Sequence, residues 1–391
     1  MSINHPIIEV AKREWDRIKS KWTLLMITVV GPLIAFLLIT IIFSQNVPRN
    51  LPVAVVDNDN SKLSHLILRY VDATPIAATH RSCFSLLDAK KAIEEGSADA
   101  AIFIPKDSEK NILKGENANI IVYLNNANVV KAGLLNSGIR KAIGTVSAGI
   151  KLKKHLQNGK TFNESYIRIM PVKLDPVLLF NPFISYSYFL TLGLMPIILI
   201  VFVLLGTTHA IGTELLRGTG PQWLKTANNN IFIALIGKII PYTALYMIIA
   251  IIMNLIFFHK LGLTINSSYY IIFLSEFLII VSYQFISFFL LGLFSNLRLS
   301  LSIGSAYCML ALTYSGLTFP EFGMPAFGQA FAQIFPFSYW LKAFIGQTIR
   351  GESVALTLNH LLPLFAFILL GTIFIPRLKH LLLNEHHWGK I

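Results

Sequence analysis

The sequence has few charged residues, and long stretches of it have none. Charged residues make up 14% of the 391 residues, whereas a soluble domain usually has about 25%. Hydrophobic residues make up 54%, and residues 176–213 contain no Asp, Glu, Lys or Arg. A helix of about 20 such residues crosses a bilayer. The composition therefore excludes an ordinary soluble protein and predicts a membrane protein.

Metal-binding and disulfide patterns are also lacking. Cys83 lies in a polar region and Cys308 in an apolar run, so the two are expected on either side of a membrane boundary and cannot pair. The ten histidines form no HExxH motif, and the sequence has no CxxC motif. The adjacent His386 and His387 are interpreted as part of a solvated tail. We therefore expect neither a metal nor a disulfide.

Nucleotide-binding and catalytic motifs are missing as well. The segment NGKT at Asn158–Thr161 matches the end of a P-loop, but Lys154 stands where that motif needs its first glycine. No Ser/His/Asp arrangement or paired-carboxylate spacing is present. We expect that the chain is not an enzyme and binds no cofactor itself.

Basic residues outnumber acidic ones, and the formal net charge is +13. A nucleic-acid-binding protein would carry a basic stripe interleaved with aromatic residues that stack on bases. Here the Lys and Arg residues flank the apolar runs or lie in one polar block. The expected partner is therefore the lipid bilayer with its acidic headgroups, and nucleic acid is excluded.

The N-terminal region predicts an interfacial helix followed by a membrane span. Residues 1–21 are amphipathic, with Trp15 expected at headgroup depth and Arg17 on the same helix. Residues 22–43 are apolar and long enough to cross. No small-x-small cleavage site follows them, so we interpret them as an uncleaved signal anchor. The basic residues before the span predict a cytoplasmic N-terminus.

Residues 44–182 form a polar block with the pattern of a small α/β domain. Expected strands at 53–56, 75–78, 98–104 and 120–124 alternate with expected helices at 61–71, 85–95, 106–113 and 129–157. One crossing after a cytoplasmic N-terminus places this domain outside. Asp57-Asn58-Asp59 lacks the spaced ligands of a calcium loop, so it is interpreted as a strand-end turn with a helix N-cap.

Five further apolar runs predict five more crossings, at 183–206, 239–258, 269–293, 299–319 and 354–375. The expected fold is thus an all-α polytopic membrane protein of six transmembrane helices with an inserted extracytoplasmic α/β domain. Arg217, Lys225, Arg298 and Arg377 then fall on the cytoplasmic side, as the positive-inside rule requires. Residues 377–391 are expected to be a cytoplasmic tail.

A short polar segment, Ile211–Tyr242, interrupts two of the apolar runs and must lie at a membrane surface. Glu214–Arg217 can start a helical turn, which Gly218, Gly220 and Pro221 then break. Trp223 and Leu224 add apolar bulk. The mixture is typical of a short helix to which a partner protein can bind.

This segment resembles the first cytoplasmic loop of ABC-2-type transporter permeases. The matching stretches are ELxRGT, WLKTA and GKxxPY, although Thr226-Ala227 stands where the family often has Thr-Pro. In that family the loop, here residues 209–238, is a coupling helix that docks on the ATP-binding subunit. The resemblance implies these coupling residues: Glu214, Arg217, Gly218, Thr219, Trp223, Leu224, Lys225 and Lys238. The alternative is an ordinary surface loop whose charges complement helix dipoles.

Two other regions are similar to the same family. LPVAVVDxDxS and GxADAAIFIP resemble the external domain of its long-loop subgroup. The aromatic, proline-broken residues 319–353 resemble its last external loop, which implies an outer gate at Phe319, Pro320, Met324 and Pro325. Prolines forbid one continuous helix there, so short re-entrant or interfacial helices are expected. The alternative is an aromatic belt at the membrane interface.

Glu276 is a charged residue within an expected span, about two turns from its outer end. An ionisable group at such a place is costly and marks a candidate functional residue. It can face an exit cavity, pair with Lys260 or Lys342, or reach the headgroups as a snorkelling acid. We include it among the candidate translocation residues.

Together these features predict the permease subunit of an ATP-driven exporter in a bacterial inner membrane, with both termini cytoplasmic. Its cargo would be an amphipathic or hydrophobic drug, lipid or glycan. A separate subunit would bind ATP and Mg, a second permease copy or paralogue would complete the path, and a periplasmic adaptor is a further conceivable partner. The alternatives are a membrane sensor or scaffold whose external domain binds a ligand, and an ion-driven secondary transporter. The latter predicts inverted repeats, which are not visible.

Overall fold

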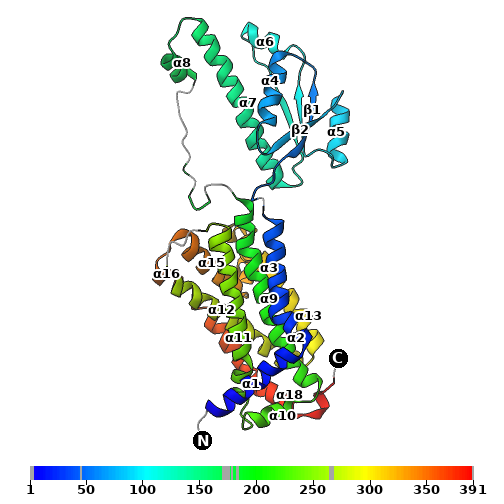
Figure 1. The fold of residues 1–391 in the computed structure, drawn as a ribbon, viewed down its shortest axis with the longest axis vertical. Helices are drawn as coiled ribbons and strands as arrows, with labels where there is room; N and C mark the ends of the chain where they lie inside the picture. Colours follow the sequence, from blue (N-terminus) through cyan, green and yellow to red (C-terminus); the bar gives the residue numbers. More distant parts are fainter. Residues whose placement is uncertain are drawn as a thin grey trace. The chain divides into compact units, whose positions relative to one another are not determined.

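The computed structural model describes residues 4–44, 46–169, 177, 179–181, 185–263 and 268–389. It has two compact units: a helical unit, Met1–Asn46 with Leu179–Ile391, and an α/β unit, Val47–Leu178. Both appear in Figure 1. The predicted start of the second crossing, at residue 183, lies outside the described residues.

Among the described residues, five helical segments of the helical unit are long and apolar enough to cross a membrane. They are Trp22–Ile42, Ser187–Leu216, Ile231–Lys260, Tyr269–Phe294 and Val354–Leu383. The remaining predicted crossing corresponds to a shorter apolar helix, α13 (Leu297–Thr313). It ends before the predicted residue 319 because Gly316, with φ of 84°, turns the chain. The predicted fold class, a helical membrane protein with an α/β segment between its first and second spans, is confirmed.

The N-terminal helix and the first span come before the α/β unit, and the other helices follow it. The first group is α1 (Asn4–Ser20), α2 (Trp22–Leu25), η1 (Met26–Val30) and α3 (Gly31–Ile42). The second comprises α9 (Tyr186–Leu216), α10 (Gly220–Thr226), α11 (Ile231–Leu255), η2 (Ile256–Lys260), α12 (Tyr269–Phe294), α13, η3 (Glu321–Gly323), α14 (Ala326–Ala332), α15 (Pro336–Ile345), η4 (Gly346–Arg350), α16 (Val354–Leu361), α17 (Leu364–Ile373), α18 (Ile375–Leu383) and η5 (Glu385–His387).

Prolines set the boundaries of the short helices after α13. Pro325 directly precedes α14, and Pro336 is the first residue of α15, where its missing N–H has no intrahelical partner to lose. The aromatic side chains of α15 then fill the core of the helical unit. Trp340 is buried and stacks on Phe337 and Phe344, with ring centroids 5.9 and 4.7 Å away.

The α/β unit is a mixed four-stranded sheet covered by helices on both faces. Its strands β1 (Leu51–Asp57), β2 (Ala77–Ser82), β3 (Ala100–Ile104) and β4 (Ile121–Leu124) lie in the order β2-β1-β3-β4. β1 is parallel to β2 and β3, and β4 is antiparallel to β3. The helices are α4 (Lys62–Asp72), α5 (Leu86–Glu94), α6 (Ser108–Lys114), α7 (Val129–Gln157) and α8 (Phe162–Ile169). The predicted alternation of strands and helices is therefore confirmed.

Alternate residues of β1 fill two apolar cores. Val53 packs with Leu135 and Ile139 of α7 on one face, and Val56 packs with Ala89 and Ala92 of α5 on the other. Both faces of a central strand between parallel neighbours are normally buried. This explains the uninterrupted apolar run at the start of the domain.

A capping box begins α4, and its removal should weaken that helix. Ser64 N donates to Ser61 Oγ at 3.1 Å, and Ser61 N donates to Ser64 Oγ at 2.9 Å. We expect Ser61→Ala to lower the local stability of α4 by about 1 kcal/mol. Faster hydrogen exchange of the α4 amides in the full chain would show it. Ser147→Ala, at an exposed position inside α7, should leave exchange unchanged, and equal protection of α4 in both variants would contradict the expectation.

A pair of hydrogen bonds joins the two chain segments from which the α/β unit is inserted. Asn46 directly precedes that unit, and Ser187 lies in the first turn of α9 after it. Ser187 N donates to Asn46 O at 3.1 Å, and Ser187 Oγ donates to Asn46 Oδ1 at 2.7 Å. These bonds thus hold the residue before the insertion against the first turn of the helix that follows it.

Candidate functional site: a buried charge cluster behind the coupling segment

The predicted coupling segment, residues 209–238, is formed by the end of α9, the short helix α10 and the start of α11. α9 stops at Leu216 because Gly218 takes a left-handed conformation, with φ of 65°. α10 follows with Pro221 in its first turn, and Asn230 caps α11 by accepting from Phe232 N at 2.9 Å. In Figure 1, α1, α10 and α18 gather at one end of the helical unit, opposite α15 and α16.

Five ionisable side chains from three separate segments meet beside α10. This charge cluster consists of Arg13, Glu14, Arg17, Glu214 and Lys238. Glu214 is at its centre: its carboxylate accepts from Arg13 at 2.9 Å, from Arg17 at 2.5 Å and from Lys238 at 2.9 Å. α1, α9 and α11 are therefore joined by charge-assisted hydrogen bonds.

Glu14 forms the second acidic centre of the charge cluster. It accepts from Lys238 Nζ at 2.7 Å and from Arg13 at 3.0 Å, and the Tyr242 hydroxyl lies 3.4 Å from its other oxygen. Lys238 thus bridges the two carboxylates of α1 and α9. The cluster holds three cations and two anions, a formal charge of +1.

The charge cluster is shielded from solvent. Glu14, Glu214 and Lys238 are fully buried, whereas the Arg13 and Arg17 side chains are 30% and 12% exposed. Buried ions persist only when they are paired and hydrogen-bonded, because desolvation costs several kcal/mol per ion. Separating α1 from α9 or α11 would leave unpaired buried charges. The cluster therefore opposes separation of the three segments.

An apolar layer beside the charge cluster attaches α10 to the same group of helices. Lys238 Nζ lies 4.3 Å from the centre of the Trp223 ring, a cation–π contact. Trp223 and Leu224 pack among buried residues of α11 and α18, including Leu235 and Leu382. At Gly220 an added Cβ would lie 2.7 Å from the Leu382 backbone oxygen, so only glycine allows α10 to approach α18 so closely.

A family model described as "ABC-2 family transporter protein" matches residues 21–375. The chain belongs to the ABC-2 transporter family. It is the membrane component of such a transporter and not itself catalytic; in this family the nucleotide is bound by an ATP-binding partner subunit. No curated protein matches the sequence. The matched range begins after α1, so three members of the charge cluster lie outside it.

The coupling residues implied by the sequence divide between the interior of the permease and its surface. Trp223, Leu224, Glu214 and Lys238 are buried within the chain itself. Gly218 and Thr219 are half-buried, and the Thr219 hydroxyl donates to the Glu214 carboxylate. Arg217 and Lys225 are exposed, together with Gln222 and Asn228–Asn230. The surface that a partner can contact is thus polar and basic, and the buried residues support it from behind.

The electrostatic environment at this end of the permease is positive. Partial burial, followed by the nearby Arg217 and Arg17 guanidinium groups, lowers the pKa of Lys21 below its ordinary value. Lys21 directly precedes the first span. Such a field attracts an acidic protein surface or anionic headgroups.

The interfacial-helix residues lie on different faces of α1. Trp15 is 39% exposed, with Lys19 Nζ 5.1 Å from its ring centre. Arg17, in contrast, turns inward to Glu214 and to Thr213 Oγ1, at 2.5 Å from each. α1 therefore offers Trp15 to its surroundings and uses Arg17 to bind the rest of the permease.

The candidate outer residues do not form a comparable cluster. Phe319, Pro320 and Pro325 are exposed, and Met324 is buried. Glu276 is buried in α12, and its Oε1 accepts from Asn254 Nδ2 of α11 at 2.8 Å. Lys342, one of the partners that the sequence offered for Glu276, pairs with Glu321 instead. The structure brings Glu276 to Asn254, which the sequence had not indicated.

Arg13 and Glu14 were missed as site residues from the sequence. A pattern that could have revealed Glu14 is its place between Val10 and Ile18, at helical spacing on the apolar stripe of α1. All three are buried against the rest of the helical unit. An acid on such a stripe needs a buried cation, and Lys238 is a basic residue in the otherwise apolar helix α11.

Proposed function

We propose that this ABC-2 permease couples ATP hydrolysis by its partner to export through the charge cluster. The partner would press on the exposed face of the coupling segment at Arg217, Gln222 and Lys225. The cargo would be an amphipathic or hydrophobic molecule, of the drug, lipid or glycan type, moved out of the cytoplasm or the inner leaflet. The membrane would be a bacterial inner membrane, with both chain termini in the cytoplasm.

The observation that carries this proposal is the burial of Glu14, Glu214 and Lys238 directly behind that face. Protein interiors are close-packed, so a displacement of α10 is passed to its neighbours rather than absorbed. α10 contacts α1, α9, α11 and α18. A push on α10 would therefore tilt two spans and move the N-terminal helix with them.

We further propose a division of the chain by role. Residues 1–21 would lie in the cytoplasmic interface, 22–43 and 183–376 in the membrane, 44–182 outside it and 377–391 in the cytoplasm. A second permease copy or paralogue would complete the transport path. The weak burial of the spans Trp22–Ile42 and Val354–Leu383 supports this, since they offer surface to lipid or to such a copy. The external α/β unit is available to a periplasmic adaptor, and ATP and Mg would stay on the partner.

Reversing the charge of the coupling surface should weaken the complex without unfolding the permease. In the double variant Arg217→Glu, Lys225→Glu, we expect affinity for the ATP-binding subunit to fall at least about tenfold, or about 1.4 kcal/mol. Both side chains are exposed, so the thermal stability of the permease alone should be unchanged. Co-purification and stimulated ATP hydrolysis measure the effect. Arg298→Glu, at an exposed basic residue of α13, is the matched control.

Equal ATPase binding by the double variant and the control would contradict the coupling role of this face. Purified permease that moved cargo on an ion gradient, with no ATP-binding subunit present, would favour a secondary transporter. A stable complex with a signalling partner alone would favour a scaffold.

A further inference from the structure

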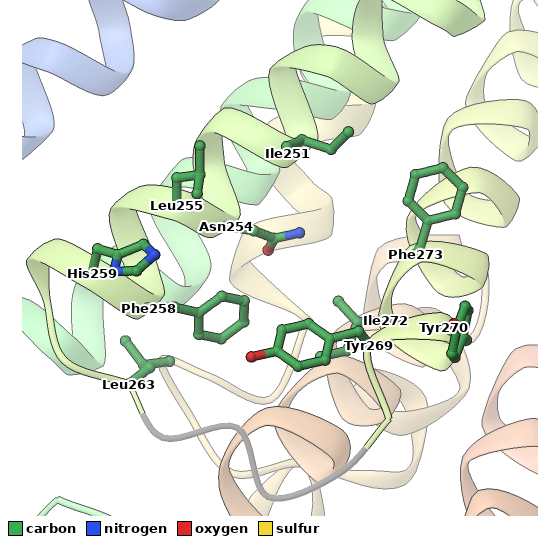
Figure 2. A pocket seen from close by; sticks show the side chains of 10 residues that line it. All are labelled: Ile251, Asn254, Leu255, Phe258, His259, Leu263, Tyr269, Tyr270, Ile272 and Phe273. Carbon is green, nitrogen blue, oxygen red and sulfur yellow. The ribbon is translucent and has the colours of Figure 1, made fainter.

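A cavity of about 730 Å³ lies between the end of α11 with η2 and the start of α12. This volume is typical of sites for small molecules. Its walls are mainly apolar and aromatic, and include Phe258, Leu263, Tyr269 and Phe273. Figure 2 shows these side chains around an open centre, into which the Asn254 carboxamide projects.

The Asn254 side-chain oxygen is a hydrogen-bond acceptor at this cavity that receives no hydrogen bond from the described residues. Its amide nitrogen is already used, because Nδ2 donates to Glu276 Oε1 at 2.8 Å. Its oxygen is buried and has no hydrogen-bond partner among the described residues. In Figure 2 that oxygen turns toward the space beside Phe258 and Tyr269. A ligand that places an N–H or O–H group there would satisfy it.

Glu276, directly behind Asn254, adds a second buried oxygen without a partner among the described residues and an ionisable carboxyl group. It is 1% exposed, and its Oε2 is buried with no hydrogen-bond partner in the described part of the chain. Within the same residues, Glu276 has no ion pair with a Lys or Arg side chain. A buried carboxylate normally requires a cation nearby. Among the described residues, the hydrogen bond that Glu276 accepts from another side chain comes from the Asn254 amide.

From this arrangement we propose that the cavity binds a lipophilic amine in its protonated form. The ammonium donates to Asn254 Oδ1, the Glu276 carboxylate supplies the compensating charge through the same amide, and the apolar part of the ligand packs on the aromatic walls. The faces of Phe258 and Tyr269 add cation–π attraction. An anionic ligand is disfavoured, because it would place its own acceptors against two acceptors that lack donors.

As an assignment of cargo class this inference rests on the proposed export function, but the binding step needs no ATP-binding subunit. The test uses the full-length permease alone in lipid nanodiscs. The probes are a dansyl fluorophore joined through a decyl chain to a primary ammonium, and the matched molecule that ends in a hydroxyl. Dansyl fluorescence, corrected with nanodiscs that lack protein, gives the affinity for each probe.

The wild-type permease should bind the ammonium probe at least roughly tenfold more tightly than the alcohol, since charge-assisted hydrogen bonds contribute more than neutral ones. Glu276→Gln should remove this preference and leave affinity for the alcohol unchanged, because glutamine retains an oxygen for Asn254. Glu321→Gln, which removes an acid that is partly exposed, should keep the preference. Tyr270→Ala, at an 86% exposed lining residue, should weaken both probes by a similar factor without affecting folding.

Three results would overturn the proposal. One is a wild-type permease with no preference for the ammonium probe, which decides the matter even if Glu276→Gln does not fold. Another is a Glu276→Gln variant that folds and keeps the wild-type preference. The last is a Tyr270→Ala variant with a changed oligomeric state but unchanged affinity for both probes. That result would mean that a second copy of the chain, and not the probe, fills the cavity. A permease that binds the ammonium probe but does not stimulate an ATP-binding subunit would count against the proposed function alone.

Discussion

Replacing Glu214 with glutamine is expected to destabilise the permease by about 3–5 kcal/mol, because it removes one member of a buried set of ions and leaves the others uncompensated. Glu214 pairs with Arg13, Arg17 and Lys238. The formal charge of the charge cluster would rise from +1 to +2. The variant should also lose stimulation of the ATP-binding subunit, since α1, α9 and α11 would no longer be held together. Thermal unfolding in detergent and ATPase assays measure the two effects.

A second substitution separates charge balance from a general loss of packing. Lys238→Met alone brings the charge cluster to zero and should cost less than Glu214→Gln. Added to Glu214→Gln, it restores the charge of +1 and should recover part of the lost stability. The interaction energy of such neighbouring sites reaches about 0.5–3 kcal/mol. Strictly additive effects of the two substitutions would show that the pair is not energetically coupled.

Gly237→Ala should displace α1 and destabilise the helical unit by about 1–3 kcal/mol, the usual cost of overpacking a core. A Cβ at this position would lie 2.8 Å from Val10 Cβ and 2.9 Å from the backbone oxygen of Ile7. The added methyl group would therefore push α1 as a whole away from α11. This movement would also disturb the contact of Glu14 with Lys238. Unfolding temperature and protease accessibility of α1 measure the change.

The control for this substitution is a helical glycine with free space around it. An added Cβ at Gly144 in α7 meets no atom within 4 Å. Gly144→Ala should therefore be neutral or stabilising by up to about 1 kcal/mol, as helix propensity predicts. If Gly237→Ala behaved in the same way, the close approach of α1 and α11 would have no role in stability.

The spans and the α/β unit were predictable because each depends on local patterns. Apolar length alone locates the span at Tyr269–Phe294, and alternation of short strands and helices locates the four-stranded sheet. The end of α13 was less predictable. Residues 314–319 carry no charge that would mark the end of a span, and the positive φ of Gly316 depends on the turn that follows.

The candidate site was only partly predictable, because its key contacts join residues far apart in the sequence. The family pattern drew attention to Glu214, Trp223 and Lys238, but it gave no indication that these side chains face inward. Glu14 and Lys238 are 224 residues apart, and no periodicity connects them. The same holds for Asn254 and Glu276, which become partners only when α11 and α12 pack together.

The bonds between Asn46 and Ser187 make the α/β unit resemble a removable insertion. They hold the residue before the unit against the first turn of α9, so a replacement can start and end at neighbouring points of the helical unit. A short glycine-rich linker in place of Val47–Leu178 should leave the helical unit folded, and a different ectodomain grafted at the same junction should be tolerated. Related permeases could thereby differ in this inserted unit while keeping the same helical unit.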